Sequence, residues 1–239
     1  MSTPVSRSIV LASASVSIPS ADPRTTEAKR ILAPLSLTLD EPRIAVIGAN
    51  GSGKSTLLRL LNGLVLPSTG TVHVHGRSTH SDGPAVRTTV GFVFTDPLSQ
   101  LVMPTPLEDV ELSLRRQKLG KARRRAAALD ILADYQLSHL ATSSIYELSG
   151  GERQLVALAA VLAVSPSVLV LDEPSTMLDL RNTRLLMQRL EALPQQVIMS
   201  THDLSLAAGF DRVLVIDNGQ LAYDGGPREA IARYRGLVE

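Results

Sequence analysis

The sequence of 239 residues contains no cysteine and no tryptophan, and aromatic residues make up only 3% of it. Without cysteine the chain has neither disulfide bonds nor thiolate metal centres, which is typical of proteins in a reducing compartment. Its 24 basic and 23 acidic residues leave a net charge of +1, so no global field attracts nucleic acid or acidic lipid. Any polyanion that the protein binds must therefore be held by a local site.

Long apolar runs are also missing. The first residues, Met1–Arg7, lack a charged segment followed by a sustained apolar one, so we expect no secretory signal. The longest apolar run, Leu155–Val164, has about half of the ~18–20 residues that a membrane-spanning helix needs. We expect a buried helix at this run, a protein that stays inside the cell, and a membrane role only through a partner.

Short apolar runs alternate with segments of helical periodicity. This alternation predicts a parallel sheet covered by helices. The stretch from about 95 to 150 is mostly helical and is expected to be an inserted subdomain. A helix is expected over Ser55–Leu61, after a glycine-rich loop. Strands are expected over 8–18, 35–39, 44–47, 71–75, 89–94, 168–171, 196–200 and 213–216.

The segment Gly48–Thr56 reads GANGSGKST and matches the phosphate-loop pattern between an apolar strand and an amphipathic helix. Glycines let successive backbone N–H groups curl round phosphate oxygens, and the helix N-terminus adds its positive dipole end. We expect Lys54 to reach the β- and γ-phosphates of ATP and Ser55 to bind Mg²⁺. The residues expected to contact the nucleotide are Gly48, Asn50, Gly51, Ser52, Gly53, Lys54, Ser55 and Thr56.

Two carboxylates follow a strongly apolar run, Val168–Leu171. A buried charge is unfavourable unless something pairs with it, so Asp172 is expected to bind Mg²⁺. Glu173 comes next in the chain and is expected to accept a proton from the water that attacks the γ-phosphate. Both expectations depend on the phosphate loop being present.

A third segment, Leu148–Gln154, reads LSGGERQ. We call it the signature segment, and Ser149 with the amides of Gly150 and Gly151 is expected to form a second anion cradle at a helix start. With these three segments in this order, the chain resembles the nucleotide-binding subunits of ATP-binding cassette (ABC) proteins, from about Ile9 to Gly226. The resemblance implies a head-to-tail dimer in which the signature segment faces the partner's ATP.

The resemblance also implies an α/β P-loop NTPase fold, with a mostly parallel core sheet, antiparallel strands near the N-terminus and the helical subdomain. It places the ATPase domain at residues 7–226 and a short helix or tail at 227–239. Asp179 looks like the family's dimer-contact aspartate. His202 looks like the switch histidine at the γ-phosphate, which acts with Glu173 and Lys54 in catalysis.

The sequence departs from the family pattern in two ways. The family usually has a glutamine after the strand that ends near Phe94, where this chain has Thr95; Gln100 lies nearby in the sequence, and which residue replaces the glutamine stays open. The family also stacks adenine on an aromatic residue near the end of the first strand, but no aromatic residue precedes Phe92. We therefore expect a weak contact to the base from Ile18 or Arg24.

The segment Val90–Leu101 is similar to one in the ATPases of energy-coupling-factor (ECF) transporters, and Leu178–Asn182 is most similar to the biotin-transporter group. The resemblance implies a peripheral position on the cytoplasmic face of the cell membrane. The implied partners are a second ABC ATPase subunit, identical or a sister, a transmembrane coupling protein and a substrate-binding membrane subunit. Two alternatives stay open: a cobalt or nickel importer, and a soluble ATPase of an iron–sulfur assembly complex.

Two further stretches have competing interpretations. Leu98, Leu101, Val102 and Met103 either line a groove for a helix of the coupling protein or pack the helical subdomain's own core. The Arg-rich stretch 115–125 holds seven basic residues without interleaved aromatic residues. We interpret it as a solvated helix face and expect no nucleic-acid partner.

Overall fold

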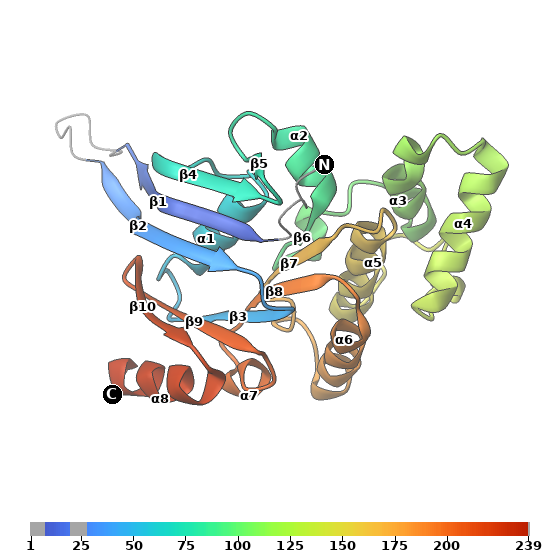
Figure 1. The fold of residues 1–239 in the computed structure, drawn as a ribbon. Coiled ribbons are helices and arrows are strands. Elements are labelled where there is room, and N and C mark those ends of the chain that lie inside the picture. Colours follow the sequence, from blue (N-terminus) through green and yellow to red (C-terminus); the bar gives the residue numbers. More distant parts are fainter. Residues whose placement is uncertain (1–7, 20–27, 239) are drawn as a thin grey trace.

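The computed structural model describes residues 8–19 and 28–238. Within them the chain forms two sheets, a helix between them and a helical layer on the far side (Figure 1). The four-stranded sheet has the order β2-β1-β4-β5 and the six-stranded sheet the order β10-β9-β3-β8-β7-β6. This arrangement confirms the expected α/β cassette with N-terminal antiparallel strands.

The four-stranded sheet is antiparallel. Its strands are β1 (Ile9–Ile18), β2 (Lys29–Leu39), β4 (Thr69–Val74) and β5 (Arg77–Ser78). The strand expected at 35–39 is the second half of the 11-residue β2, which continues through Pro34. Proline is accepted there because β2 lies at the edge of the sheet, where an N–H group need not be paired.

The six-stranded sheet is parallel except for β10, which runs antiparallel to β9. Its strands are β3 (Arg43–Ile47), β6 (Val90–Val93), β7 (Val168–Asp172), β8 (Gln196–Ser200), β9 (Arg212–Asp217) and β10 (Gln220–Gly225). Strand β10 was not predicted, although Asn218 and Gly219 form a two-residue turn with φ of 46° and 75°. An Asn-Gly turn of this kind is a strong hairpin signal.

Eight α-helices occur in the described ranges: α1 (Lys54–Leu61), α2 (Gly83–Thr89), α3 (Pro106–Ser113), α4 (Lys121–Asp134), α5 (Gly150–Leu162), α6 (Leu180–Ala192), α7 (Leu204–Ala207) and α8 (Pro227–Val238). The strand expected over 89–94 is shorter, because Thr89 ends α2 and its hydroxyl donates to the carbonyl of Ala85. Within the described ranges, no helix is long and apolar enough to cross a membrane.

Strand β3 is buried on both faces and divides the core into two clusters. Ile44 and Val46 join a cluster with α1 and the antiparallel sheet, so α1 packs between the two sheets. Ala45 and Ile47 face the other cluster, which contains side chains of α5, α6, α7 and α8. The continuous apolar pattern of this segment predicts a parallel strand that is buried on both faces, and the structure confirms it.

Helices α3, α4 and α5 share a third cluster, away from the antiparallel sheet (Figure 1). The apolar run predicted to be a buried helix forms most of α5, in which Val156 and Ala157 are fully buried. The basic side chains at the start of α4 are mainly exposed, as expected for a solvated face. The carboxyl ends of β3, β7 and β8 meet at one edge of the parallel sheet, the usual place for a ligand in such a fold.

Candidate functional site

The loop between β3 and α1 is shaped by glycines in the left-handed region. Gly48 has a φ of 154°, and a Cβ there would lie 2.1 Å from the carbonyl oxygen of Ile216. Gly53, with a φ of 110°, precedes the first residue of α1. The buried Ser52 Oγ makes no hydrogen bond to any described residue. The loop therefore presents amides and a free hydroxyl at a helix N-terminus, which suits phosphate oxygens.

Lys54 is the first residue of α1 and is only 5% exposed. Its Nζ donates hydrogen bonds to the carbonyls of Gly48, at 2.9 Å, and Ala49, at 3.1 Å. The same ammonium lies 3.5 Å from Glu173 Oε1. A buried cation is thus held across the mouth of the loop, where it can meet the charge of a phosphate group.

Asp172 ends β7 and is 1% exposed. Its Oδ1 accepts a hydrogen bond of 2.9 Å from Ser55 Oγ and one of 2.8 Å from Ser200 Oγ. Both partners are neutral hydroxyls, so the buried charge fits a cation placed beside it. The donor set of a carboxylate and a serine hydroxyl is the oxygen chemistry that hard divalent cations prefer.

Sequence reasoning missed Ser200, which is fully buried at the end of β8. The parallel register places it opposite Asp172. Its hydroxyl donates to Asp172 and accepts a hydrogen bond of 2.9 Å from the amide of Glu173. One side chain therefore positions both carboxylates. No pattern within the chain reveals the pair, because it depends on which strands become neighbours.

Glu173 has a φ of 51°, which is uncommon for a residue with a side chain. Its amide also donates to the carbonyl of Ser200, at 3.2 Å. Oε2 lies 2.8 Å from His202 Nδ1 and accepts a hydrogen bond from the His202 amide. Oε1 makes no hydrogen bond to the described residues. The structure thus brings Lys54, Glu173 and His202 together and leaves one buried carboxylate oxygen able to accept from water.

The signature segment lies apart from the phosphate loop, at the N-terminus of α5. Ser149 caps the helix, and its amide and hydroxyl both donate to Glu152 Oε2, each at 2.7 Å. These hydrogen bonds hold the pKa of Glu152 below its usual range. The Ser149 part of the expected anion cradle is therefore bound by the chain's own carboxylate, which an incoming anion must replace.

Asp179 lies beside the signature segment. It caps α6 by accepting a 2.7 Å hydrogen bond from the Asn182 amide, and Asn182 packs against Gly151. An open groove lined by Ser175, Asp179 and His202 connects this region with Glu173. Asp179 and the signature segment therefore form a second group of predicted residues, separate from the group around Lys54.

Three residues were considered in place of the family's glutamine and its adenine-stacking aromatic residue: Gln100, Ile18 and Arg24. Gln100 Oε1 accepts from the Phe94 amide at 3.2 Å, and its Nε2 donates to the carbonyl of Ala157 at 3.3 Å. Its amide thus joins the end of β6 to α5 and does not replace the missing glutamine in this conformation. Ile18 ends β1 with 47% exposure, as a contact to a base requires. Arg24 lies outside the described residues.

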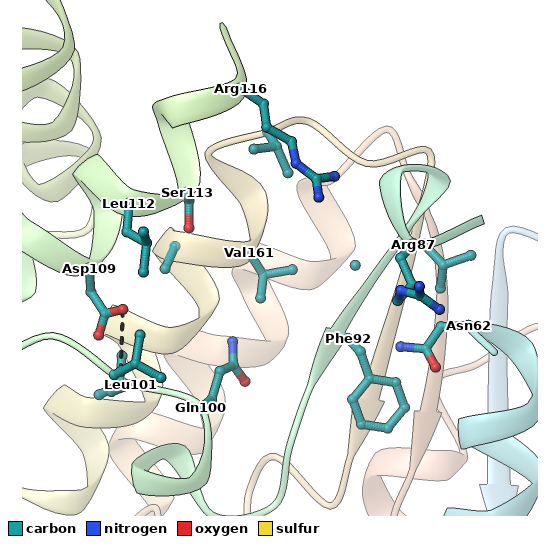
Figure 2. Close-up of a pocket in the computed structure, with 15 residues that line it drawn as sticks. Asn62, Arg87, Phe92, Gln100, Leu101, Asp109, Leu112, Ser113, Arg116 and Val161 are labelled. Carbon is teal, nitrogen blue, oxygen red and sulfur yellow. Dashed lines mark hydrogen bonds between the residues drawn. The ribbon is translucent and has the colours of Figure 1, made fainter. Parts of the chain in front are cut away.

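A cavity of about 400 Å³ lies between β6 and the helical layer (Figure 2). Leu101 and Val102 both line it; Leu101 is 5% exposed and belongs to the helical core, whereas Val102 is 69% exposed. Asp109 reaches into it, with Oδ2 free of hydrogen bonds to the described residues. Burial raises the pKa of Asp109, although the amides of Val102 and Met103 oppose this. Leu101 therefore packs the helical subdomain's own core, and the groove interpretation stays a prediction for the exposed Val102.

The sequence is similar to those of ATP-binding proteins of transporters. The family description "ABC transporter" matches residues 32–176. The chain is 48% identical over 211 residues to the biotin transport ATP-binding protein BioM of Rhizobium etli, covering 88% of this chain and 94% of that one. It is 37% identical over 189 residues to the energy-coupling factor transporter ATP-binding protein EcfA1 of Halalkalibacterium halodurans, covering 77% and 68%.

Among solved structures, the fold is similar to that of the ATP-binding cassette MJ0796 in a dimeric post-hydrolysis state bound to ADP and Pi. The TM-score is 0.82 at 28% sequence identity, and the match covers 92% of this chain and 99% of that one. The similarity therefore extends over nearly the whole chain.

Proposed function

The chain belongs to the ABC transporter family of ATP-binding proteins, and from this premise we propose that it powers the uptake of biotin as the ATPase subunit of an ECF-type importer. The observation that supports the substrate most directly is the 48% identity to a biotin transport ATP-binding protein over nearly the full length of both chains. The ATPase domain spans residues 7–226, with a helical subdomain at about 95–150, and the short C-terminal stretch 227–239 contains α8.

The phosphate loop holds the triphosphate of ATP. Lys54 leaves the carbonyls of Gly48 and Ala49 and turns to the β- and γ-phosphates, since a phosphate is a stronger partner for an ammonium than a neutral carbonyl. Ser55 and Asp172 would hold Mg²⁺, which would supply charge neutralisation at the phosphates. The 2.9 Å contact between their oxygens supports this assignment, because both can reach one cation.

Glu173 orients the attacking water and accepts its proton through Oε1. Its amide and carboxylate are fixed by Ser200 and His202, so the base needs little reorganisation at the moment of reaction. His202 and Lys54 stabilise the charge that develops on the transferred phosphoryl group. Ser200 is a positioning residue, since it acts through Asp172 and Glu173.

The site is completed by a second ATPase subunit. Ser149, with the amides of Gly150 and Gly151, binds the γ-phosphate held by the partner, and Asp179 contacts the partner across the interface. Closure requires the Ser149 hydroxyl to exchange Glu152 for phosphate. ATP binding closes the dimer and phosphate release opens it, and this cycle moves the attached membrane subunits on the cytoplasmic face of the membrane.

The cavity of Figure 2 is the proposed docking site for a helix of the transmembrane coupling protein. Exposed Val102 offers apolar contact to that helix. The cavity lies between β6 and the helical layer. A movement of the helical layer relative to β6 would therefore displace a helix that is bound in the cavity.

Uptake of labelled biotin tests the function. The gene is deleted in its native host and restored as the parent chain or as Lys54→Ala. We expect uptake to be lost on deletion and restored by the parent only. Co-purification from mild detergent should recover a multi-spanning coupling protein and a substrate-binding membrane subunit. If biotin uptake survives deletion while cobalt or nickel uptake is lost, the substrate assignment is wrong.

A further inference from the structure

One aromatic ring of this chain is exposed and packs into none of the three hydrophobic clusters of the described residues. The sequence contains three phenylalanines, four tyrosines and no tryptophan. In the structure Tyr146 is 74% exposed. The other six pack against the hydrophobic cores: Phe92, Phe94, Tyr135, Phe210, Tyr223 and Tyr234. An exposed tyrosine is common by itself, so its position and its backbone decide whether it matters.

The backbone of Tyr146 is fixed although its ring is not covered. It lies in a turn closed by a 3.0 Å hydrogen bond from the amide of Glu147 to the carbonyl of Ser144. Arg153 of α5 donates to the carbonyl of Tyr146 and to that of Ile145, each at 2.8 Å. Ile145 is only 3% exposed and anchors the turn in the helical core. A ring on a fixed backbone loses little conformational entropy when a partner covers it.

Arg153 also ties this turn to the helix that the signature segment begins. Tyr146 is three residues before Ser149, and three residues of chain span at most about 10 Å. In the closed dimer Ser149 faces the γ-phosphate of the partner's ATP. The ribose and the base extend from that phosphate over a comparable length, so a side chain this close to Ser149 can reach the nucleoside end.

The nucleoside end lacks an aromatic partner in its own subunit. The residue at the end of β1 is Ile18, an aliphatic side chain with 47% exposure. The sequence has no aromatic residue before Phe92, which is buried and packs on Phe94 with the ring centroids 4.8 Å apart. A flat purine on an aliphatic edge leaves its second face open to any ring that the dimer brings to it.

We propose that Tyr146 of each subunit stacks on the adenine of the ATP held by its partner, so that base recognition is completed only in the dimer. This inference rests on the proposed function, because it requires the head-to-tail closed state. It makes Tyr146 a binding residue that acts between subunits. ATP binding by the separate subunit is then weak, and affinity for the base is gained on closure.

The test measures ATP-driven dimerisation in a Glu173→Gln background by light scattering coupled to size-exclusion chromatography. We expect Tyr146→Ala to raise the ATP concentration for half-maximal dimerisation about 10-fold, in line with the effect of removing a ring that stacks on a base. Tyr146→Phe retains the ring and should stay within about twofold of the background variant. Leu129→Ala removes an exposed side chain of α4 and is the matched control.

A second measurement tests whether Tyr146 acts on the ATP of its own subunit or on that of the partner. Binding of a fluorescent ATP analogue is measured without Mg²⁺, at a protein concentration where the chain is monomeric. Tyr146→Ala should bind as tightly as the parent there, since the ring acts on the partner's nucleotide. A loss of monomer binding would place Tyr146 at its own subunit's ATP and overturn the proposal. Half-maximal dimerisation of Tyr146→Ala at the same ATP concentration as the Glu173→Gln background alone would overturn it as well.

Controls distinguish an effect on adenine stacking from unfolding of the variant and from failure of the proposed function. Thermal melting checks that each variant is folded, and Tyr146→Leu replaces Tyr146→Ala if the latter melts early. Hydrolysis by the parent is measured in parallel. If the parent does not hydrolyse ATP and the Glu173→Gln background does not dimerise with ATP, the proposed function fails. If both occur and adding Tyr146→Ala does not change dimerisation, only the role of Tyr146 fails.

Discussion

Ser200 offers the sharpest test of the site, since its hydroxyl serves both carboxylates. Ser200→Ala removes a 2.8 Å hydrogen bond to Asp172 and a 2.9 Å hydrogen bond from the Glu173 amide. A hydrogen bond to a charged group is worth about 1.5–3 kcal/mol. If the loss is expressed mainly in the transition state, kcat falls about 10- to 100-fold, because each 1.36 kcal/mol is roughly tenfold in rate.

The same substitution weakens the fold. Asp172 stays buried with one hydroxyl partner fewer, which lowers the free energy of unfolding by about 1–3 kcal/mol. For a chain of this size that corresponds to a decrease in Tm of roughly 2–10 °C. Steady-state ATPase assays and thermal melting measure the two effects separately. Ser205→Ala in α7, where the side chain is exposed, should change neither.

A purely structural role is distinguished by the pattern of kinetics. Because Ser200 positions Glu173, KM for ATP should change less than kcat. For the same reason, adding Ser200→Ala to Glu173→Gln should cost little further activity. A parent-like kcat in Ser200→Ala would refute the positioning role. So would a loss in the double variant equal to the sum of the two separate losses.

Three other outcomes follow from the structure. Glu173→Gln should abolish most hydrolysis and trap an ATP-bound dimer on size-exclusion chromatography; hydrolysis at the parent rate would contradict its role as base. Thr95→Gln should retain or raise hydrolysis, and a large loss would show that Thr95 is an adapted part of the site. Burial raises the pKa of Asp109, so stability should fall as pH rises above its unfolded pKa of about 4. Asp109→Asn should remove that part of the pH dependence and raise Tm at pH 7; an unchanged melting profile from pH 4 to 7 would disprove it.

Much of the site was predictable because its segments are local. The phosphate loop needs glycines at positive φ followed by a helix start, and both are determined by residues within one short segment. Asp172 was predictable for a similar reason, since a charge at the end of an apolar strand must find a partner. Burial of β3 and α5 followed from their hydrophobic patterns.

Two differences from the predicted strands concern local features of the chain. The Asn218-Gly219 turn indicated the hairpin that β10 completes. Strand β2 continues through Pro34, because an edge strand accepts a proline. Whether a strand lies at an edge depends on the order of the sheet, and that order arises from contacts between distant segments.

The sequence by itself determined the chemistry: a phosphate loop, two carboxylates after a buried strand and a serine-glycine helix start, each held within a few consecutive residues. Only the tertiary structure decided how they cooperate. The register of β7 and β8 placed Ser200 against Asp172, and the convergence of α1 with these strands placed Lys54 and His202 on the two oxygens of Glu173. Such contacts join residues far apart in the chain, so no local pattern can specify them.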